Sequence, residues 1–275
     1  MKIHSISKVL AIFPFLAILC ILMYGMGNHE SWSVLIFIPV FLLVVLYNFY
    51  GQIDYWWNTK NPEIIDAKLK EWLLIYSPFY NGLNDEQKKK FEDRLMLYID
   101  AREYKSIGTK EHKEVPFDIK GIIASQAIRL TLGVKDFLIG DLDRIYCYKH
   151  PFPTPRYHPL HTVEVDAEDG MLILSLEHAI AGIVNPTEYF NIACYGYTQA
   201  FLHVNPNYDY PVVGEETWSD ITLVTGMTRE AIEGNIGLLP INMRALHITA
   251  YFDYKDKYAE RFPLHFEKWV SVFGV

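Results

Sequence analysis

Basic residues and cysteines are both scarce in this chain of 275 residues. Lys and Arg together number 25, against 33 Asp and Glu, which gives a formal net charge of −8. A nucleic-acid-binding protein needs a basic face, so no nucleic-acid partner is expected. Three cysteines argue against a disulfide framework, and they cannot supply the four thiolates of an all-cysteine zinc site.

Charge is also limited, since charged residues make up 21% of the chain and hydrophobic residues 51%. That composition argues against a disordered chain. There is no internal repeat, and isolated glycines such as Gly133 and Gly140 fit no nucleotide-binding fingerprint. Aromatic residues are abundant instead, with 19 Tyr, 16 Phe and 6 Trp. Such a content fits a packed fold and also a membrane interface.

Two long runs without a charge lie near the N-terminus, from Val9 to Gly27 and from Trp32 to Gly51. Each is long enough to cross a bilayer as a helix. A buried core helix would usually keep a polar stripe, and these runs have none. We therefore expect a transmembrane hairpin over residues 1–58, with spans at about 9–27 and 32–51. No small-x-small site follows Met23, so cleavage as a signal peptide is not expected.

Lysines flank the pair of runs on both outer sides (Lys2, Lys8, Lys60, Lys68 and Lys70). The loop between the runs carries Glu30 and no Lys or Arg. The positive-inside rule then places both termini in the cytoplasm, with the protein in the inner membrane and the lipid bilayer as a partner. Interfacial anchors are expected at Trp32, Tyr47, Tyr50, Tyr55, Trp56 and Trp57.

Residues 59–275 are predicted to form one α+β domain. Helical patterns cover residues 62–76, 85–104, 118–133, 187–204, 229–234 and 243–260. A strand is predicted at 144–148, and a hairpin pairs 162–165 with 171–174. Asn84 or Asp85 is expected to cap the second helix, and Glu188 to begin the fourth. Cys147 and Cys194 are expected to be buried and inert.

The order of several motifs resembles a known family. The motifs are Phe117 to Leu132 with Ile123-Ala124-Ser125-Gln126-Ala127, Ile145 to Tyr148 followed by Pro151-Phe152, Gly170 to Ser175, a helix near residue 190, and a late helix ending in Arg261-Phe262-Pro263. From about Trp72 to Trp269 the chain resembles the Mlc titration factor A (MtfA-like) family of zinc-dependent peptidases. The resemblance implies a gluzincin-like, zincin-type fold for the cytoplasmic domain.

The chemistry of that family requires an H-E-x-x-H helix, in which two His bind zinc and the Glu is the general base. The resemblance places the first His at Tyr195, the Glu at Gly196 and the second His at Gln199, with a later Glu ligand at Ala250. No H-E-x-x-H occurs in this chain. Without zinc ligands no hydroxide is available at neutral pH. We therefore expect a degenerate member without catalytic residues or a cofactor.

Two other sites are considered. Tyr189, Tyr197 and Phe201 lie beside the degenerate motif. They either form a core helix or line a pocket for a small ligand, a peptide or a cytoplasmic protein. His158, His161 and Glu164 are the candidate ligands of a relocated zinc site.

The favoured function is a membrane-anchored, inactive peptidase homologue that acts as a binding or regulatory module. The alternatives are an active zinc-dependent hydrolase with relocated ligands and a structural or assembly protein of the cell envelope. Residue patterns alone leave all three open.

Overall fold

A computed structural model describes residues 6–28, 34–108 and 114–274. The expectations for Lys2, Glu30 and Trp32 lie outside these residues. Contacts divide the chain into two compact units, Met1–Glu63 and Ile64–Val275. We call them the hairpin unit and the α+β unit, and describe each by itself.

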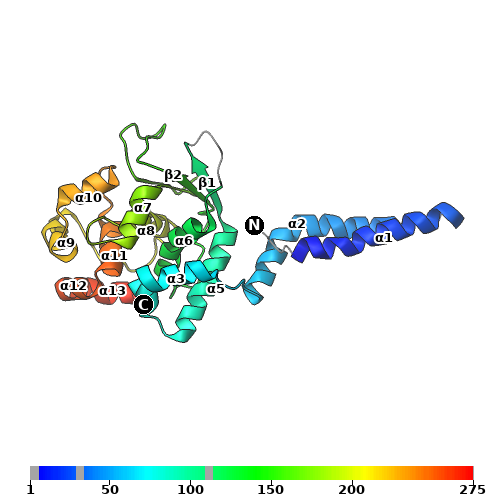
Figure 1. The fold of residues 1–275 in the computed structure, drawn as a ribbon, viewed down its shortest axis with the longest axis horizontal. Coiled ribbons are helices and arrows are strands. Elements are labelled where there is room, and N and C mark those ends of the chain that lie inside the picture. Colours follow the sequence, from blue (N-terminus) through cyan, green and yellow to red (C-terminus); the bar gives the residue numbers. More distant parts are fainter. Residues whose placement is uncertain (1–5, 29–33, 109–113, 275) are drawn as a thin grey trace. The chain divides into compact units, whose positions relative to one another are not determined.

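The hairpin unit consists of α1 (Ile6–Asn28) and α2 (Phe37–Lys60), which lie side by side (Figure 1). Both are long and apolar enough to cross a membrane, with mean hydropathies of 2.5 and 2.3. Pro39 falls in the first turn of α2, where a helix needs no backbone donor, whereas Pro14 lies inside α1. A carboxylate joins the two helices, because Asp54 accepts hydrogen bonds from the Ser7 amide (2.8 Å) and hydroxyl (2.9 Å).

The α+β unit is mostly helical. Its helices are α3 (Ala67–Tyr76), α4 (Pro78–Asn81), α5 (Asp85–Ala101), α6 (Phe117–Thr131), α7 (Leu176–Val184), α8 (Ile192–Val204), α9 (Trp218–Thr225), α10 (Arg229–Ile236), α11 (Met243–Asp253), α12 (Lys255–Arg261) and α13 (Pro263–Phe273), with a 3-10 turn at Glu215–Thr217. Its strands are β1 (Glu103–Ile107), β2 (Arg144–Tyr148), β3 (Val163–Asp166) and β4 (Met171–Ser175). The predicted α+β class is confirmed at this level; the gluzincin-like fold stays a prediction.

The four strands form one mixed sheet in the order β1-β2-β4-β3. The pairs β1–β2 and β2–β4 are parallel, and β3 pairs antiparallel with β4 through the predicted hairpin. In β1–β2, Tyr104 lies opposite Ile145. Gly170 closes the hairpin turn at φ +61°, where a Cβ would lie 2.2 Å from the Asp141 carbonyl oxygen. Only glycine fits this turn.

Helix α8 lies at the centre of the α+β unit. It packs on β3 and β4 through one side, and α6 and α11 contact its other sides (Figure 1). Nine of its residues are buried: Ile192, Ala193, Cys194, Tyr195, Gly196, Tyr197, Thr198, Ala200 and Phe201. The positions that the resemblance singled out on this helix therefore belong to an enclosed part of the unit.

Several predicted boundaries were wrong. Glu188 does not begin a helix, because α8 starts at Ile192, after the Asn191 carboxamide accepts from the Cys194 amide (3.0 Å). The predicted helix over 85–104 ends at Ala101, and β1 follows it. The helix predicted over 243–260 is interrupted at Tyr254. The predicted cap at Asn84 is confirmed, and Gln87 completes a capping box.

Candidate functional site

Tyr195 connects two helices. Its side chain is only 2% exposed, and its hydroxyl accepts a hydrogen bond from the Asn242 amide at 2.9 Å. Asn242 in turn caps α11 by accepting from the Ala245 amide. Burial raises the pKa of Tyr195 to about 12, so the phenol is neutral at physiological pH. The hydrogen bond between the neutral Tyr195 hydroxyl and the Asn242 amide therefore links α8 to the start of α11.

Gly196 and Ala250 occupy close contacts between elements. A Cβ at Gly196 would lie 2.7 Å from Leu172 Cδ1 and 2.9 Å from Val163 Cγ2. The absent side chain lets α8 approach the sheet, and the same space could not hold a glutamate. Ala250 is fully buried in α11, the helix that packs on α8. Gln199 is half-buried.

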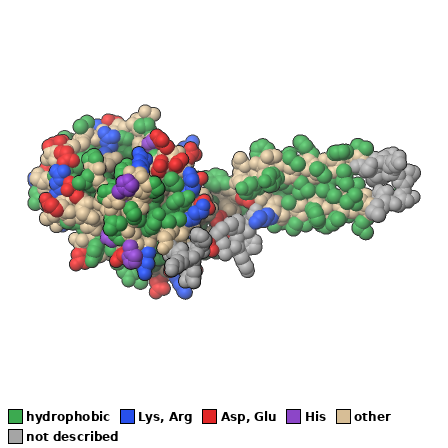
Figure 2. Space-filling model, turned by 90° about the horizontal axis from the view of Figure 1, so that it is seen from above, with side chains coloured by type: hydrophobic (Ala, Val, Ile, Leu, Met, Phe, Trp, Pro, Cys, Tyr) green, Lys and Arg blue, Asp and Glu red, His purple; other side chains and the backbone are tan. Residues whose placement is uncertain are grey.

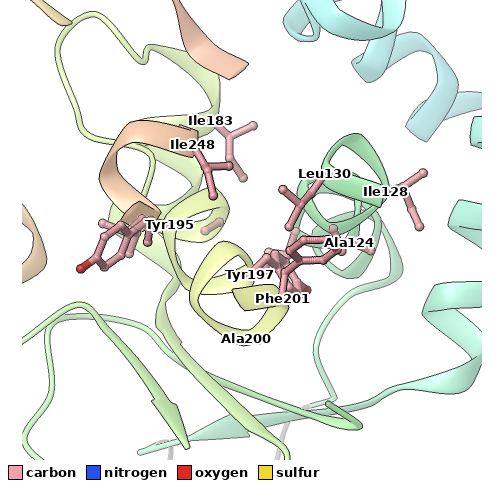
Figure 3. Packing of buried hydrophobic residues seen from close by; sticks show 14 of the residues in the cluster. Ala124, Ile128, Leu130, Ile183, Tyr195, Tyr197, Ala200, Phe201 and Ile248 are labelled. Carbon is pink, nitrogen blue, oxygen red and sulfur yellow. The ribbon is translucent and has the colours of Figure 1, made fainter. Parts of the chain in front are cut away.

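Two of the three residues considered either as core or as pocket lining, Tyr197 and Phe201, lie in the core. Tyr197 and Phe201 are fully buried and point toward Ala124 and Leu130 of α6 (Figure 3). The Tyr197 ring meets the Tyr98 ring edge to face at 6.0 Å. Tyr189 is 43% exposed and precedes α8. Tyr197 and Phe201 complete the core rather than line a groove, because α8 is enclosed by the sheet and by α6 and α11.

An ionic network surrounds the N-terminus of α8, and sequence reasoning missed it. Arg129 Nη2 of α6 pairs with Asp253 Oδ1 of α11 at 2.5 Å. Asn191 Nδ2 donates to Gln126 Oε1 at 3.1 Å. Burial opposes the charge of Arg129, but the attraction of Asp253 outweighs it and the pKa is raised. The network joins α6, α8 and α11, and its partners lie up to 124 residues apart in sequence, so no local signal could have found it.

The predicted burial of Cys147 and Cys194 is confirmed. Burial raises the pKa of Cys194 to about 11 and that of Cys147 to about 12. Both side chains are therefore thiols at neutral pH, and the thiolate is the nucleophilic form. Neither position has the electrostatics of a reactive cysteine.

The structure brings together two of the three candidate zinc ligands. His161 Nε2 lies 3.0 Å from Glu164 Oε2, and both side chains are buried. His161 Nδ1 lies 2.8 Å from the carbonyl oxygen of Pro159, so this nitrogen is the donor. His158 is exposed in the loop before them. Over the described residues, no three His, Cys, Asp or Glu side chains gather as metal ligands would. The His161 ring also meets the rings of Phe152 and Tyr157, which belong to the proline-rich loop.

Both ring nitrogens of His247 take part in a series of hydrogen bonds. Trp269 Nε1 donates to the Tyr258 hydroxyl (2.9 Å), which lies 2.8 Å from His247 Nδ1. His247 Nε2 lies 2.9 Å from Thr217 Oγ1, whose proton goes to the carbonyl of Gly214. When the Tyr258 hydroxyl donates to Nδ1, every donor in this chain has an acceptor, with a neutral imidazole protonated on Nε2. Burial, with His265 nearby, lowers the pKa of His247 to about 3.

The hairpin unit carries the other candidate functional surface. Apolar side chains are exposed along both helices, as Figure 2 shows, and few residues of either helix are buried. Five of the predicted interfacial aromatics are exposed on α2 (Tyr47, Tyr50, Tyr55, Trp56 and Trp57). Lys60 Nζ lies 4.4 Å from the centre of the Trp56 ring. This arrangement suits lipid tails along the helices and headgroups at the aromatic end.

The chain matches no family model, no curated protein and no solved structure.

Proposed function

We propose that the protein is anchored in the bilayer by α1 and α2, and that the α+β unit acts at the cytoplasmic face as a binding or regulatory module. The exposed apolar surface of the two helices carries this proposal. A helix of 23 residues is about 35 Å long, which is enough to cross a hydrocarbon core of about 30 Å. In water that surface would be a large apolar patch, which monomeric proteins avoid.

The lysine distribution supports an orientation with both termini in the cytoplasm. Lys8 lies in the first turn of α1, and Lys60 ends α2. Lys68 and Lys70 follow on α3. The segment between the two helices has no Lys or Arg in the sequence. Short basic segments are retained on the cytoplasmic side of the inner membrane.

A binding role without peptidase chemistry is supported by what occupies the positions that the resemblance singled out. Tyr195 fastens two helices, and Gly196 and Ala250 are contact points between elements. These three residues stabilise the packing of helices and sheet, as core residues do. We therefore propose that the α+β unit is a catalytically inactive homologue of the Mlc titration factor A peptidases.

Fractionation of the full chain tests the anchor. We expect it to float with membranes in a density gradient and to stay in the pellet after extraction at alkaline pH. Release into the soluble fraction would contradict the proposal.

Fusions at the C-terminus test the orientation. A C-terminal fluorescent protein should fluoresce, and a C-terminal alkaline phosphatase should be inactive. The reverse pattern would contradict cytoplasmic termini.

Metal content tests the inactive homologue. We expect less than about 0.1 equivalent of zinc in detergent-purified protein carrying a tag without histidine, because a catalytic zinc site needs three protein ligands. About one equivalent would contradict the proposal, and loss of that zinc in His161→Ala would locate the ligand.

A further inference from the structure

A groove runs between the two helices of the hairpin unit. Its volume is about 580 Å³, and its walls are almost entirely apolar. Residues of both helices line it: Ser7, Lys8 and Ala11 of α1, and Val40, Leu43, Val44, Leu46, Tyr47 and Tyr50 of α2. The lining residues of α2 extend over about three turns, from Val40 to Tyr50.

Lys8 is the charged residue among those that line the groove. Lys8 is exposed, and no carboxylate among the described residues pairs with it. The nearby Asp54 accepts two hydrogen bonds from Ser7. Lys8 also lies in the first turn of α1, where the positive end of the helix dipole favours an anion. The groove therefore combines apolar walls with one lysine that makes no ion pair among the described residues.

We propose that this groove binds one acyl chain of an anionic phospholipid of the bilayer, with the lipid phosphate paired to Lys8. The inference rests on the proposed membrane anchor, because it requires α1 and α2 to lie among lipids. The long lysine side chain reaches the headgroup region while its stem covers apolar surface.

Charge complementarity favours a lipid over a helix from a second copy. Two copies inserted in one bilayer have the same orientation, so their Lys8 side chains would lie at the same depth. Packing the grooves against each other would bring these two cations together, while the nearest carboxylate, Asp54, already accepts from Ser7. An anionic lipid supplies a phosphate for Lys8 and an acyl chain for the groove.

The expected selectivity comes from the headgroup alone. An acyl chain entering the groove leaves one apolar medium for another, so the hydrophobic effect does not discriminate between lipids with identical chains. A lysine near an anionic surface contributes about 1 kcal/mol. That energy corresponds to about a five-fold preference for phosphatidylglycerol over phosphatidylcholine.

Native mass spectrometry of the full chain, released from micelles containing equal amounts of the two lipids, measures this preference. We expect one retained phosphatidylglycerol, favoured about five-fold. Lys8→Gln should bring the ratio close to one. Lys60→Gln is the matched control, because Lys60 lies over Trp56, outside the groove, and should leave the ratio unchanged. Equal ratios in the two variants would overturn the proposal.

The groove itself is tested by filling it. Ala11→Phe places a ring in the channel and should abolish retention of either lipid. Ala17→Phe is the control, since Ala17 is exposed on α1 and does not line the groove. Unchanged retention in Ala11→Phe, or a dimer without lipid in the wild type, would overturn the lipid site. A chain that floats with membranes but shows no preference refutes this inference alone, whereas a soluble chain refutes the proposed anchor.

Discussion

Single polar groups in the core of the α+β unit differ in how well they are paired, and this difference decides what their removal costs. Tyr195 accepts from the Asn242 amide. Tyr104 is also buried, yet its hydroxyl has no hydrogen-bond partner of good geometry among the described residues. Buried polar groups are costly when unpaired and modestly stabilising when paired. The two tyrosines should therefore respond oppositely to loss of the hydroxyl.

Tyr195→Phe should lower the free energy of unfolding by about 1–2 kcal/mol, because the Asn242 amide is left without its acceptor. Tyr104→Phe should be neutral or slightly stabilising, because it removes an unpaired hydroxyl. Denaturant unfolding of the full chain in micelles, followed by tryptophan fluorescence, measures both. Equal losses in the two variants would contradict this assignment.

His247 makes the α+β unit sensitive to acid. Its pKa is lowered to about 3 in the folded state, from an ordinary value of 6.5. Above pH 6.5 both states are neutral, and the full stability is present. As the pH falls below 6.5 the unfolded state takes up the proton first, so stability is lost until about pH 3. Between pH 7 and pH 4 the loss from this group is about 3 kcal/mol.

The test compares the wild type with His247→Gln at pH 7 and pH 4. The variant should be less stable at pH 7, because it breaks the bonds to Tyr258 and Thr217. It should also lose about 3 kcal/mol less than the wild type on acidification. The same measurement of unfolding reports both effects. An identical pH dependence in the two proteins would show that His247 does not carry this sensitivity.

At the level of elements, the sequence predicted what local signals encode. The cap at Asn84 and the alternation in β2, β3 and β4 depend on nearby residues, and these predictions were confirmed or nearly so. β1 was missed because its pairing partner, β2, lies about 40 residues further along the chain. The hydrogen bond of Tyr195 was not predicted for the same reason, since its partner Asn242 is 47 residues away. Tertiary contacts, rather than propensity, decide such positions.

The close approach of α8 to the sheet should depend on Gly196. Gly196→Ala places a methyl group less than 3 Å from Leu172 and Val163, so it should cost about 1–3 kcal/mol. Gly234→Ala is the control, because Gly234 lies in α10 with nothing within 4 Å of an added Cβ. That change should stabilise α10 by up to about 1 kcal/mol. Thermal unfolding of both variants checks the prediction, which fails if Gly196→Ala is as stable as the wild type.

At the level of the whole molecule, exposed apolar residues have opposite meanings in the two units. In the hairpin unit they are continuous along α1 and α2. In the α+β unit exposed apolar side chains lie among charged and polar ones (Figure 2), and Leu223 is one of the exposed residues. Scattered exposed leucines are ordinary on a surface in water, whereas a continuous apolar surface on the helix pair is what the proposed bilayer anchor needs. The same substitution should therefore act differently in the two units.

Leu16→Arg and Leu42→Arg each place a charge on an exposed side chain, Leu16 near the middle of α1 and Leu42 near the middle of the uncharged run from Trp32 to Gly51. An arginine at the centre of a membrane helix costs about 2.5–3.5 kcal/mol of insertion free energy. We expect each variant to show a larger fraction released by alkaline extraction, and the double variant a larger fraction still. Leu223→Arg puts the same charge at a residue of α9 that is 65% exposed. It should leave membrane retention and stability unchanged, because that side chain already faces water. If all three single variants fractionate like the wild type, the apolar faces of α1 and α2 are not in contact with lipid.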